Sequence, residues 1–155
     1  MCLPFPSIEH QRVLLNIAAE FRNYFRGKPC EVFISPLDLW LINKEKTLNF
    51  KVQRGLMLIC DKAGLRESAY YGVPILIIEI ISPSNQSHDR IRKYNTYMEF
   101  GVKEYWIVNP KLKTIEVYVL KEGEYKQNGV YNGCNSAVSP SFDELEIHLK
   151  EIFSE

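Results

Sequence analysis

Apolar residues recur along the chain with two different spacings, and the changes between these spacings predict where helices and strands alternate. After Ser7 the spacing is helical, because apolar side chains fall on one face at Val13, Leu14, Ile17, Ala18, Phe21 and Phe25. Ser7 is placed to cap the start of this helix, and Gly27 is placed to end it near Arg26. The first expected element is therefore a helix between Ser7 and Gly27.

Short apolar runs bounded by turn residues follow, and each of them is typical of a β-strand. The predicted strands are Glu31–Ile34, Leu37–Ile42, a third within 50–60 that is clearest at Leu56–Cys60, then Ile75–Ile81, Glu104–Val108 and Thr114–Leu120. A polar hairpin-like link is expected at 43–47, a loop or short helical turn at 61–71, and a loop-rich stretch at 128–140. Near the end, 145–149 alternates weakly, and Ile152 and Phe153 form an apolar end that can pin the C-terminus.

A second helical pattern lies between two of these strands. The segment Asp89–Phe100 is predicted to be a helix with Ser87 or Asp89 at its start, and Gly101 is placed to end it. Its apolar face consists of Ile91, Tyr94, Tyr97 and Met98. The whole pattern predicts a mixed α/β domain with a central sheet, one helix before it and one helix inserted into it.

One charged residue interrupts the most apolar of the predicted strands. Within Ile75–Ile81 every position is apolar except Glu79, and such a run suits a strand that is buried on both faces. A carboxylate is almost never fully buried without compensation, so Glu79 should have a cation, a donor cluster or a metal beside it. The next segment supplies Arg90, Arg92 and Lys93. Two interpretations stay open: a metal site, or a structural ion pair.

Length and charge narrow the classes of protein to consider. A chain of 155 residues is expected to form one domain, 1–155, with a real core. Its net charge is zero, with 19 basic and 19 acidic residues, so composition gives no global support for nucleic-acid binding. A local DNA-facing surface stays open beside the alternative of a solvated face; its candidate residues are Lys44, Lys46, Lys51, Arg54, Arg90, Arg92 and Lys103.

The sequence also bears on where the protein works. Its apolar runs are too short to span a bilayer, and its first residues lack the apolar segment of a secretory signal, so a cytoplasmic protein without membrane contact is expected. The four cysteines, Cys2, Cys30, Cys60 and Cys134, lie far apart without paired spacing. Reduced thiols are expected for all of them, with Cys60 as a small buried hydrophobe.

Several stretches resemble one known family when they are taken together. VPILIIEIISPS at 73–84, DRIRKYNTY at 89–97 and GVKEYWIVNP at 101–110 are similar to segments of a restriction endonuclease family in the PD-(D/E)XK nuclease superfamily, formerly a domain of unknown function. VFISPLDLWL at 32–41, VQRGLMLICD at 52–61 and SPSFDELEIHLKEIF at 139–153 also fall where that family has similar segments. The resemblance covers nearly the whole chain. It implies a restriction-endonuclease-like core, in which a central mixed β-sheet is flanked by helices.

The resemblance also implies a chemistry and assigns residues to it. In that superfamily two carboxylates on adjacent strands hold Mg²⁺, or Mn²⁺ in its place, and a lysine helps to activate the attacking water. Glu79 matches the second carboxylate and metal ligand. The usual lysine position, two residues later, is Ile81 in this chain, and Lys93 matches a lysine that this family has moved onto the following helix. Lys93 and Tyr97 are four residues apart and should share a helix face.

The chain departs from the family at the first carboxylate. The family has Gln-Pro-Asp-Leu where this chain has Gln53-Arg54-Gly55-Leu56, so Gly55 replaces the aspartate and offers no ligand atom. Gln53, Gly55 and Tyr97 are expected to line the cleft. The family usually has aspartate where this chain has Ile75. Compared with the family, the chain is also expected to be shortened at its N-terminus.

No other carboxylate is a convincing replacement for the lost aspartate. Asp61 is six residues beyond Gly55, which is about 20 Å along a strand, and Asp38 lies on another predicted strand. Glu9 and Glu20 lie on the first helix, which would have to face the site. Two hypotheses follow. One is a Mg²⁺-dependent endonuclease that hydrolyses DNA with a degraded metal site; the other is an inactive domain of the same fold that binds nucleic acid or a second copy of itself as a homodimer.

Overall fold

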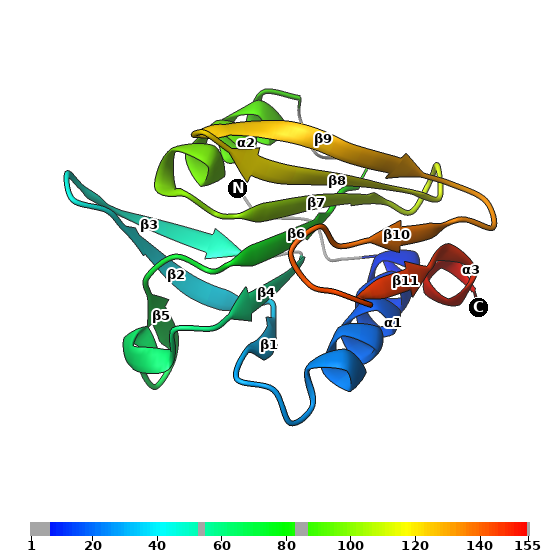
Figure 1. The fold of residues 1–155 in the computed structure, drawn as a ribbon, viewed down its shortest axis with the longest axis horizontal. Coiled ribbons are helices and arrows are strands. Elements are labelled where there is room, and N and C mark those ends of the chain that lie inside the picture. Colours follow the sequence, from blue (N-terminus) through cyan, green and yellow to red (C-terminus); the bar gives the residue numbers. More distant parts are fainter. Residues whose placement is uncertain (1–6, 53–54, 83–86, 155) are drawn as a thin grey trace.

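A six-stranded mixed sheet forms the centre of the molecule in a computed structural model that describes residues 7–52, 55–82 and 87–154 (Figure 1). The strand order is β1-β4-β6-β7-β8-β9, with bounds β1 Glu31–Ile34, β4 Gly55–Ile59, β6 Leu76–Ile80, β7 Glu104–Asn109, β8 Thr114–Lys121 and β9 Glu124–Tyr131. β6 and β7 pair in parallel and their neighbours pair antiparallel. The predicted central mixed sheet is confirmed.

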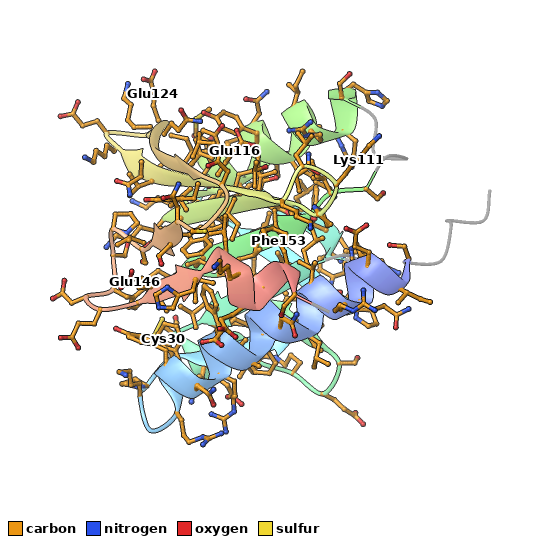
Figure 2. The ribbon with its side chains drawn as sticks, turned by 90° about the vertical axis from the view of Figure 1, so that its right-hand side faces the viewer. Cys30, Lys111, Glu116, Glu124, Glu146 and Phe153 are labelled. Atoms are coloured by element: carbon orange, nitrogen blue, oxygen red, sulfur yellow. A yellow bond between two sulfur atoms is a disulfide. The ribbon has the colours of Figure 1, made fainter. Side chains whose placement is uncertain are left out.

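Helices cover both faces of this sheet. α1 (Ile8–Phe25) and the short α3 (Leu149–Phe153) lie side by side on one face, as Figure 2 shows. α2 (Ser87–Phe100) lies on the other face and connects β6 to β7, because two parallel strands need a crossover between them. The caps follow the sequence: Ser7 Oγ accepts a hydrogen bond from the His10 N–H, and Gly27 and Gly101 have positive φ just beyond the helix ends.

Alternation along the central strands divides the core into two layers. Leu76, Ile78 and Ile80 of β6 point toward α1, whereas Ile77 and Glu79 point toward α2. The layer beneath α2 is closed by a second sheet with the order β3-β2-β5, formed by β3 (Thr47–Val52), β2 (Leu37–Ile42) and β5 (Ala69–Tyr71). A small ladder of β10 (Ser136–Val138) and β11 (Glu146–His148) extends the α1 layer.

Several predicted boundaries were wrong. The strand expected within 50–60 is two strands, β3 and β4, that belong to different sheets. The short helical turn allowed for at 61–71 is present as a 3₁₀ turn at Lys62–Gly64, but β5 follows it unpredicted. The loop expected at 128–140 holds the end of β9 and all of β10. Ile91, expected on the apolar face of the second helix, is 61% exposed. The missed strands are short or solvent-facing, so their sequences lack a strong apolar period.

The expectation of reduced thiols was wrong for two of the cysteines. Cys30 and Cys60 form a disulfide although 30 residues separate them. Cys30 precedes β1 and Cys60 follows β4, and these antiparallel strands set Glu31 opposite Ile59, which brings the two cysteines together. The sequence spacing cannot reveal this neighbourhood. Cys134 is free and exposed.

None of the described helices is long and apolar enough to cross a membrane.

Candidate active site

Strand register brings the two positions of the predicted metal site together. β4 and β6 run antiparallel with Gly55 opposite Glu79, and β6 and β7 run parallel with Glu79 opposite Ile107. The position to which the resemblance assigns the first carboxylate thus lies directly across from Glu79. The resemblance placed these two positions on adjacent strands, and in the ladder they are register partners.

Two side chains of α2 bind the Glu79 carboxylate. The Tyr97 hydroxyl donates a hydrogen bond of 2.8 Å to Oε1, and Lys93 Nζ donates one of 3.3 Å to Oε2. Glu79 is 2% exposed and Tyr97 is fully buried. Because Lys93 and Tyr97 are one helical turn apart, they reach the strand from the same face of α2, as their spacing predicted. The expectation that the buried carboxylate has a cationic partner is met by Lys93.

Burial and charge act in opposite directions on these groups. Burial raises the pKa of the Glu79 carboxyl above its ordinary value, although the charge of Lys93 and the hydrogen bonds from Tyr97 and Lys93 act to lower it. Burial, followed by the negative charge of Glu79, raises the pKa of Tyr97 well above its ordinary value. Tyr97 therefore stays protonated and keeps one carboxylate oxygen fixed, while Lys93 sets the charge environment of the other.

A second carboxylate shares the same ammonium group. Asp89 Oδ2 lies 3.5 Å from Lys93 Nζ, so Lys93 sits between Asp89 and Glu79. Asp89 Oδ1 accepts a bond of 3.3 Å from Arg92. The sequence interpretation gave Asp89 only the role of a helix-start residue. Its spacing of four residues before Lys93 was the available signal, because residues at i and i+4 are neighbours on a helix.

Gly55 serves the packing of the two strands. A Cβ atom built there would lie 1.9 Å from the backbone oxygen of Ile78, so β4 approaches β6 too closely for any side chain. The backbone N–H of Gly55 donates to Ser35 Oγ at 3.2 Å, which holds this end of β4 against the turn before β2. An aspartate at position 55 would therefore not fit between β4 and β6 as they are now spaced.

The other candidate carboxylates do not reach Glu79. Asp61 caps the 3₁₀ turn through the N–H of Ala63, and Asp38 accepts a bond from Asn49 within the second sheet. Glu9 and Glu20 belong to α1 on the opposite face of the central sheet. In the described parts of the chain no group of three His, Cys, Asp or Glu side chains is arranged to hold a metal. Gln53, expected to line the cleft, and Arg54, a candidate for the DNA-facing surface, lie outside the described residues.

With this geometry established, comparison with known proteins identifies the family. Residues 3–150 match the model of the Uma2 family, described as "Putative restriction endonuclease". The chain belongs to this family. A curated relative, "Uncharacterized protein slr1290" of Synechocystis sp., is 25% identical over 113 residues, which are 72% of this chain and 57% of that protein. The chain thus spans little more than half the length of that relative.

A solved structure supports the fold. The crystal structure of "a putative nuclease belonging to DUF820" from Anabaena variabilis superimposes with a TM-score of 0.75, covering 99% of this chain and 84% of that one. The two sequences are 17% identical, so this likeness bears on the fold alone. The mixed sheet with helices on both faces is accordingly the nuclease-like fold that the sequence predicted.

The residues of this Uma2 chain offer a metal a partial set of ligands. Mg²⁺ is commonly held by one or two carboxylates together with substrate phosphate and water. Glu79 and Asp89 are the carboxylates that converge on one point, but Lys93 Nζ lies between them, and Tyr97 already binds one oxygen of Glu79. Carboxylate oxygens are ligands that a hard divalent cation prefers, but a cation held by both Glu79 and Asp89 would have to displace the Lys93 ammonium group from its present position.

A further buried carboxylate lies on the other face of the sheet and was missed by sequence reasoning. Glu104 is fully buried and accepts bonds from Trp106 Nε1 at 2.9 Å, Ser139 Oγ at 2.8 Å and the Ser141 N–H at 3.0 Å. These neutral donors satisfy it without a cation. Glu104 therefore ties the segment before β11 to the start of β7 and has a structural role, in contrast to Glu79.

Proposed function

We propose that the chain is a Mg²⁺-dependent endonuclease that hydrolyses DNA phosphodiester bonds with a metal site weakened by Gly55. The observation that carries the proposal is the buried Glu79 carboxylate paired with Lys93 Nζ at 3.3 Å, directly across from the position where the family has its first aspartate. Membership of the Uma2 family supports the reaction class. The proposal extends that class to a specific metal, substrate and set of residues.

Each residue of the site has a role that follows from its contacts. Glu79 would hold the metal, assisted by Asp89, and Mg²⁺ or Mn²⁺ when bound would polarise the phosphate and lower the pKa of a water. Lys93 would turn its ammonium from the carboxylates toward the phosphate as negative charge develops there. Tyr97 acts as a positioning residue, because its hydroxyl fixes the orientation of the Glu79 carboxylate.

The test is nicking of supercoiled plasmid DNA in Mg²⁺, in Mn²⁺ and in EDTA. We expect slow, metal-dependent nicking that falls at least about 100-fold in Glu79→Gln and in Lys93→Met. The matched controls are Glu124→Gln and Lys126→Met, which remove the same groups from an exposed ion pair on β9 and should nick at the wild-type rate. Nicking that persists unchanged in Glu79→Gln, or in EDTA, would refute the proposal.

A second candidate function has its own observation in favour. The close approach of β4 to β6 at Gly55 excludes a carboxylate there, and the described residues supply no third acidic ligand. In this alternative the chain is a catalytically inactive binding module of the nuclease fold, with Glu79 and Lys93 as a structural ion pair. Titration calorimetry with Mn²⁺ separates the two: binding that Glu79→Gln abolishes favours the nuclease, and no binding favours the module.

A further inference from the structure

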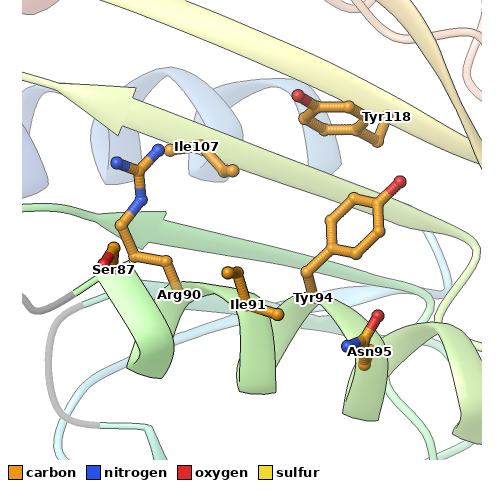
Figure 3. A pocket seen from close by; sticks show the side chains of 7 residues that line it. All are labelled: Ser87, Arg90, Ile91, Tyr94, Asn95, Ile107 and Tyr118. Carbon is orange, nitrogen blue, oxygen red and sulfur yellow. The ribbon is translucent and has the colours of Figure 1, made fainter.

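A pocket of about 450 Å³ lies between α2 and the strands β7 and β8 (Figure 3). Such a volume is within the range of sites that hold small organic groups. The side chains lining it are Ser87, Arg90, Ile91, Tyr94, Asn95, Ile107 and Tyr118. The pocket is a hollow in the surface beside the candidate active site, and the proposed function does not use it.

The pocket begins one strand away from Glu79. Ile107, which lines the pocket, is the register partner of Glu79 on the neighbouring parallel strand, and adjacent strands are about 4.8 Å apart. The candidate active site and the pocket are lined by different faces of α2. Lys93 and Tyr97 point to Glu79, whereas Arg90 and Tyr94 line the pocket. A ligand group near Glu79 and a ligand group in the pocket would therefore contact neighbouring faces of the same helix.

The chemistry of the lining fits a nucleobase and its phosphate. Tyr94 and Tyr118 meet nearly edge to face, with ring centroids 5.5 Å apart, and Ile91 and Ile107 add apolar surface. Arg90 supplies a cation at the N-terminal part of α2, and none of the seven lining residues is acidic. Aromatic rings beside a cation are the recurring means by which proteins hold an unstacked base with its backbone phosphate.

We propose that this pocket holds one unpaired nucleobase of the strand that is cleaved at Glu79. The base packs against Tyr118 and Tyr94, and Arg90 contacts a phosphate next to the scissile one. The preferred substrate is then single-stranded DNA or a duplex opened locally, since a base within an intact helix cannot enter the pocket. This inference rests on the proposed function, because it names the substrate form for the same site.

The test measures DNA binding without cleavage. Fluorescence anisotropy in EDTA compares a labelled single-stranded dodecamer with the same length of backbone in which the four central residues are abasic. The variants are Tyr118→Ala, Tyr118→Phe and Arg90→Gln. Tyr118 is chosen because its ring contacts two tyrosines, Tyr94 and Tyr125, whereas the ring of Tyr94 contacts three, Tyr105, Tyr118 and Tyr125. Arg22→Gln, at an exposed arginine of α1, is the matched control for loss of charge.

We expect the wild type to bind the complete dodecamer at least about fivefold more tightly than the abasic one. Tyr118→Ala should abolish this preference, and Tyr118→Phe should keep it because the ring remains. Arg90→Gln should weaken binding of both oligonucleotides, and Arg22→Gln should change neither. Retention of the variants' thermal unfolding midpoints would show that the comparison is between folded proteins.

The results separate this inference from the proposed function. Equal binding of the two oligonucleotides by the wild type, a preference that survives in Tyr118→Ala, or no binding at all would overturn the pocket assignment. If the pocket assignment is overturned in one of these ways but the plasmid is nicked, the nuclease proposal is retained without the base pocket. A base preference that depends on Tyr118, found together with no cleavage of the plasmid or of the single-stranded dodecamer in any metal, supports the pocket and refutes hydrolysis.

Discussion

Glu79 is a charged side chain whose burial is unfavourable for folding. Its carboxylate is buried in a strand whose other residues are apolar, and it meets a single ammonium group and a single hydroxyl. Burial of a charged pair costs free energy that its mutual attraction only partly offsets. A residue that is unfavourable for the fold, yet supplied with donors from a neighbouring helix, is typical of a functional site.

The raised pKa of Glu79 gives the folded protein a pH-dependent stability of known sign. Between the ordinary carboxyl pKa and the raised one, the folded state binds more protons than the unfolded state, so the free energy of unfolding falls as pH rises. The contribution is therefore fully present below the ordinary value and is lost as pH rises through the raised pKa. Glu79→Gln cannot ionise and should lack this loss.

Urea unfolding from about pH 4 to pH 8 checks this expectation. The stability of Glu79→Gln relative to the wild type should increase with pH over this interval and then level off. Glu124→Gln, at an exposed carboxylate of β9, is the control for loss of one negative charge. A difference between Glu79→Gln and the wild type that is independent of pH, or that shrinks as pH rises, would contradict the expected direction.

The elements show which parts of the fold a sequence can reveal. Long or strongly apolar segments, such as α1 and β6, were predicted nearly to their ends, because α1 buries one face with a helical period and β6 is apolar on both faces. β5, β10 and the end of β9 were missed, since a three-residue strand or a strand with polar residues on one face carries little periodic signal. Pairing across the ladder, which sets the disulfide and the position of Gly55, has no counterpart in local sequence.

The candidate site was predictable to a similar depth. A lone carboxylate in an apolar strand identified Glu79, and resemblance to a family identified Lys93. The shared contact of Asp89 with Lys93 and the pocket beside Ile107 depend on how α2 lies across the sheet. No pattern in the sequence fixes that placement, because it results from packing against two sheets at once.

The spacing of β4 and β6 predicts that Gly55 is indispensable to the sheet. Gly55→Ala and Gly55→Asp would each place a Cβ atom 1.9 Å from the Ile78 oxygen, which belongs to the backbone and cannot rotate away. We expect each variant to lose at least about 2 kcal/mol of stability in urea unfolding. Gly55→Asp should therefore fail to restore metal binding, although it restores the residue that the family has.

A second glycine provides the comparison for this experiment. Gly129→Ala, on the edge strand β9, would also meet close atoms, but they belong to the Tyr131 ring, a half-buried side chain that can move. Its cost should be well below that of Gly55→Ala. Equal stability of the two variants, or a Gly55→Asp protein that folds normally and binds Mn²⁺, would mean that the two strands separate easily.

At the scale of the whole molecule, most of the described cationic side chains near the candidate site form ion pairs with carboxylates. The net charge is zero, and the described cations around α2 are largely paired: Lys46 with Glu99 at 2.8 Å, and Arg92 and Lys93 with Asp89. Arg90 lines the pocket instead of joining these pairs. A net charge of zero gives no overall attraction to DNA, so recognition would depend on local contacts.

Stability of the whole chain should depend on the link between Cys30 and Cys60. The disulfide closes a loop of 30 residues that includes β1, β2, β3 and β4, so its presence restricts the unfolded chain. We expect reduction of the wild type, or Cys30→Ala, to lower the free energy of unfolding by about 3 kcal/mol. Cys134→Ala, at an exposed free thiol, is the control and should change it by less than about 0.5 kcal/mol. The measurement is urea unfolding with and without a reducing agent. A wild type whose free energy of unfolding is unaffected by the reductant would contradict the expectation. A Cys30→Ala variant that does not respond to the reductant would show that the whole effect of reduction comes from this disulfide.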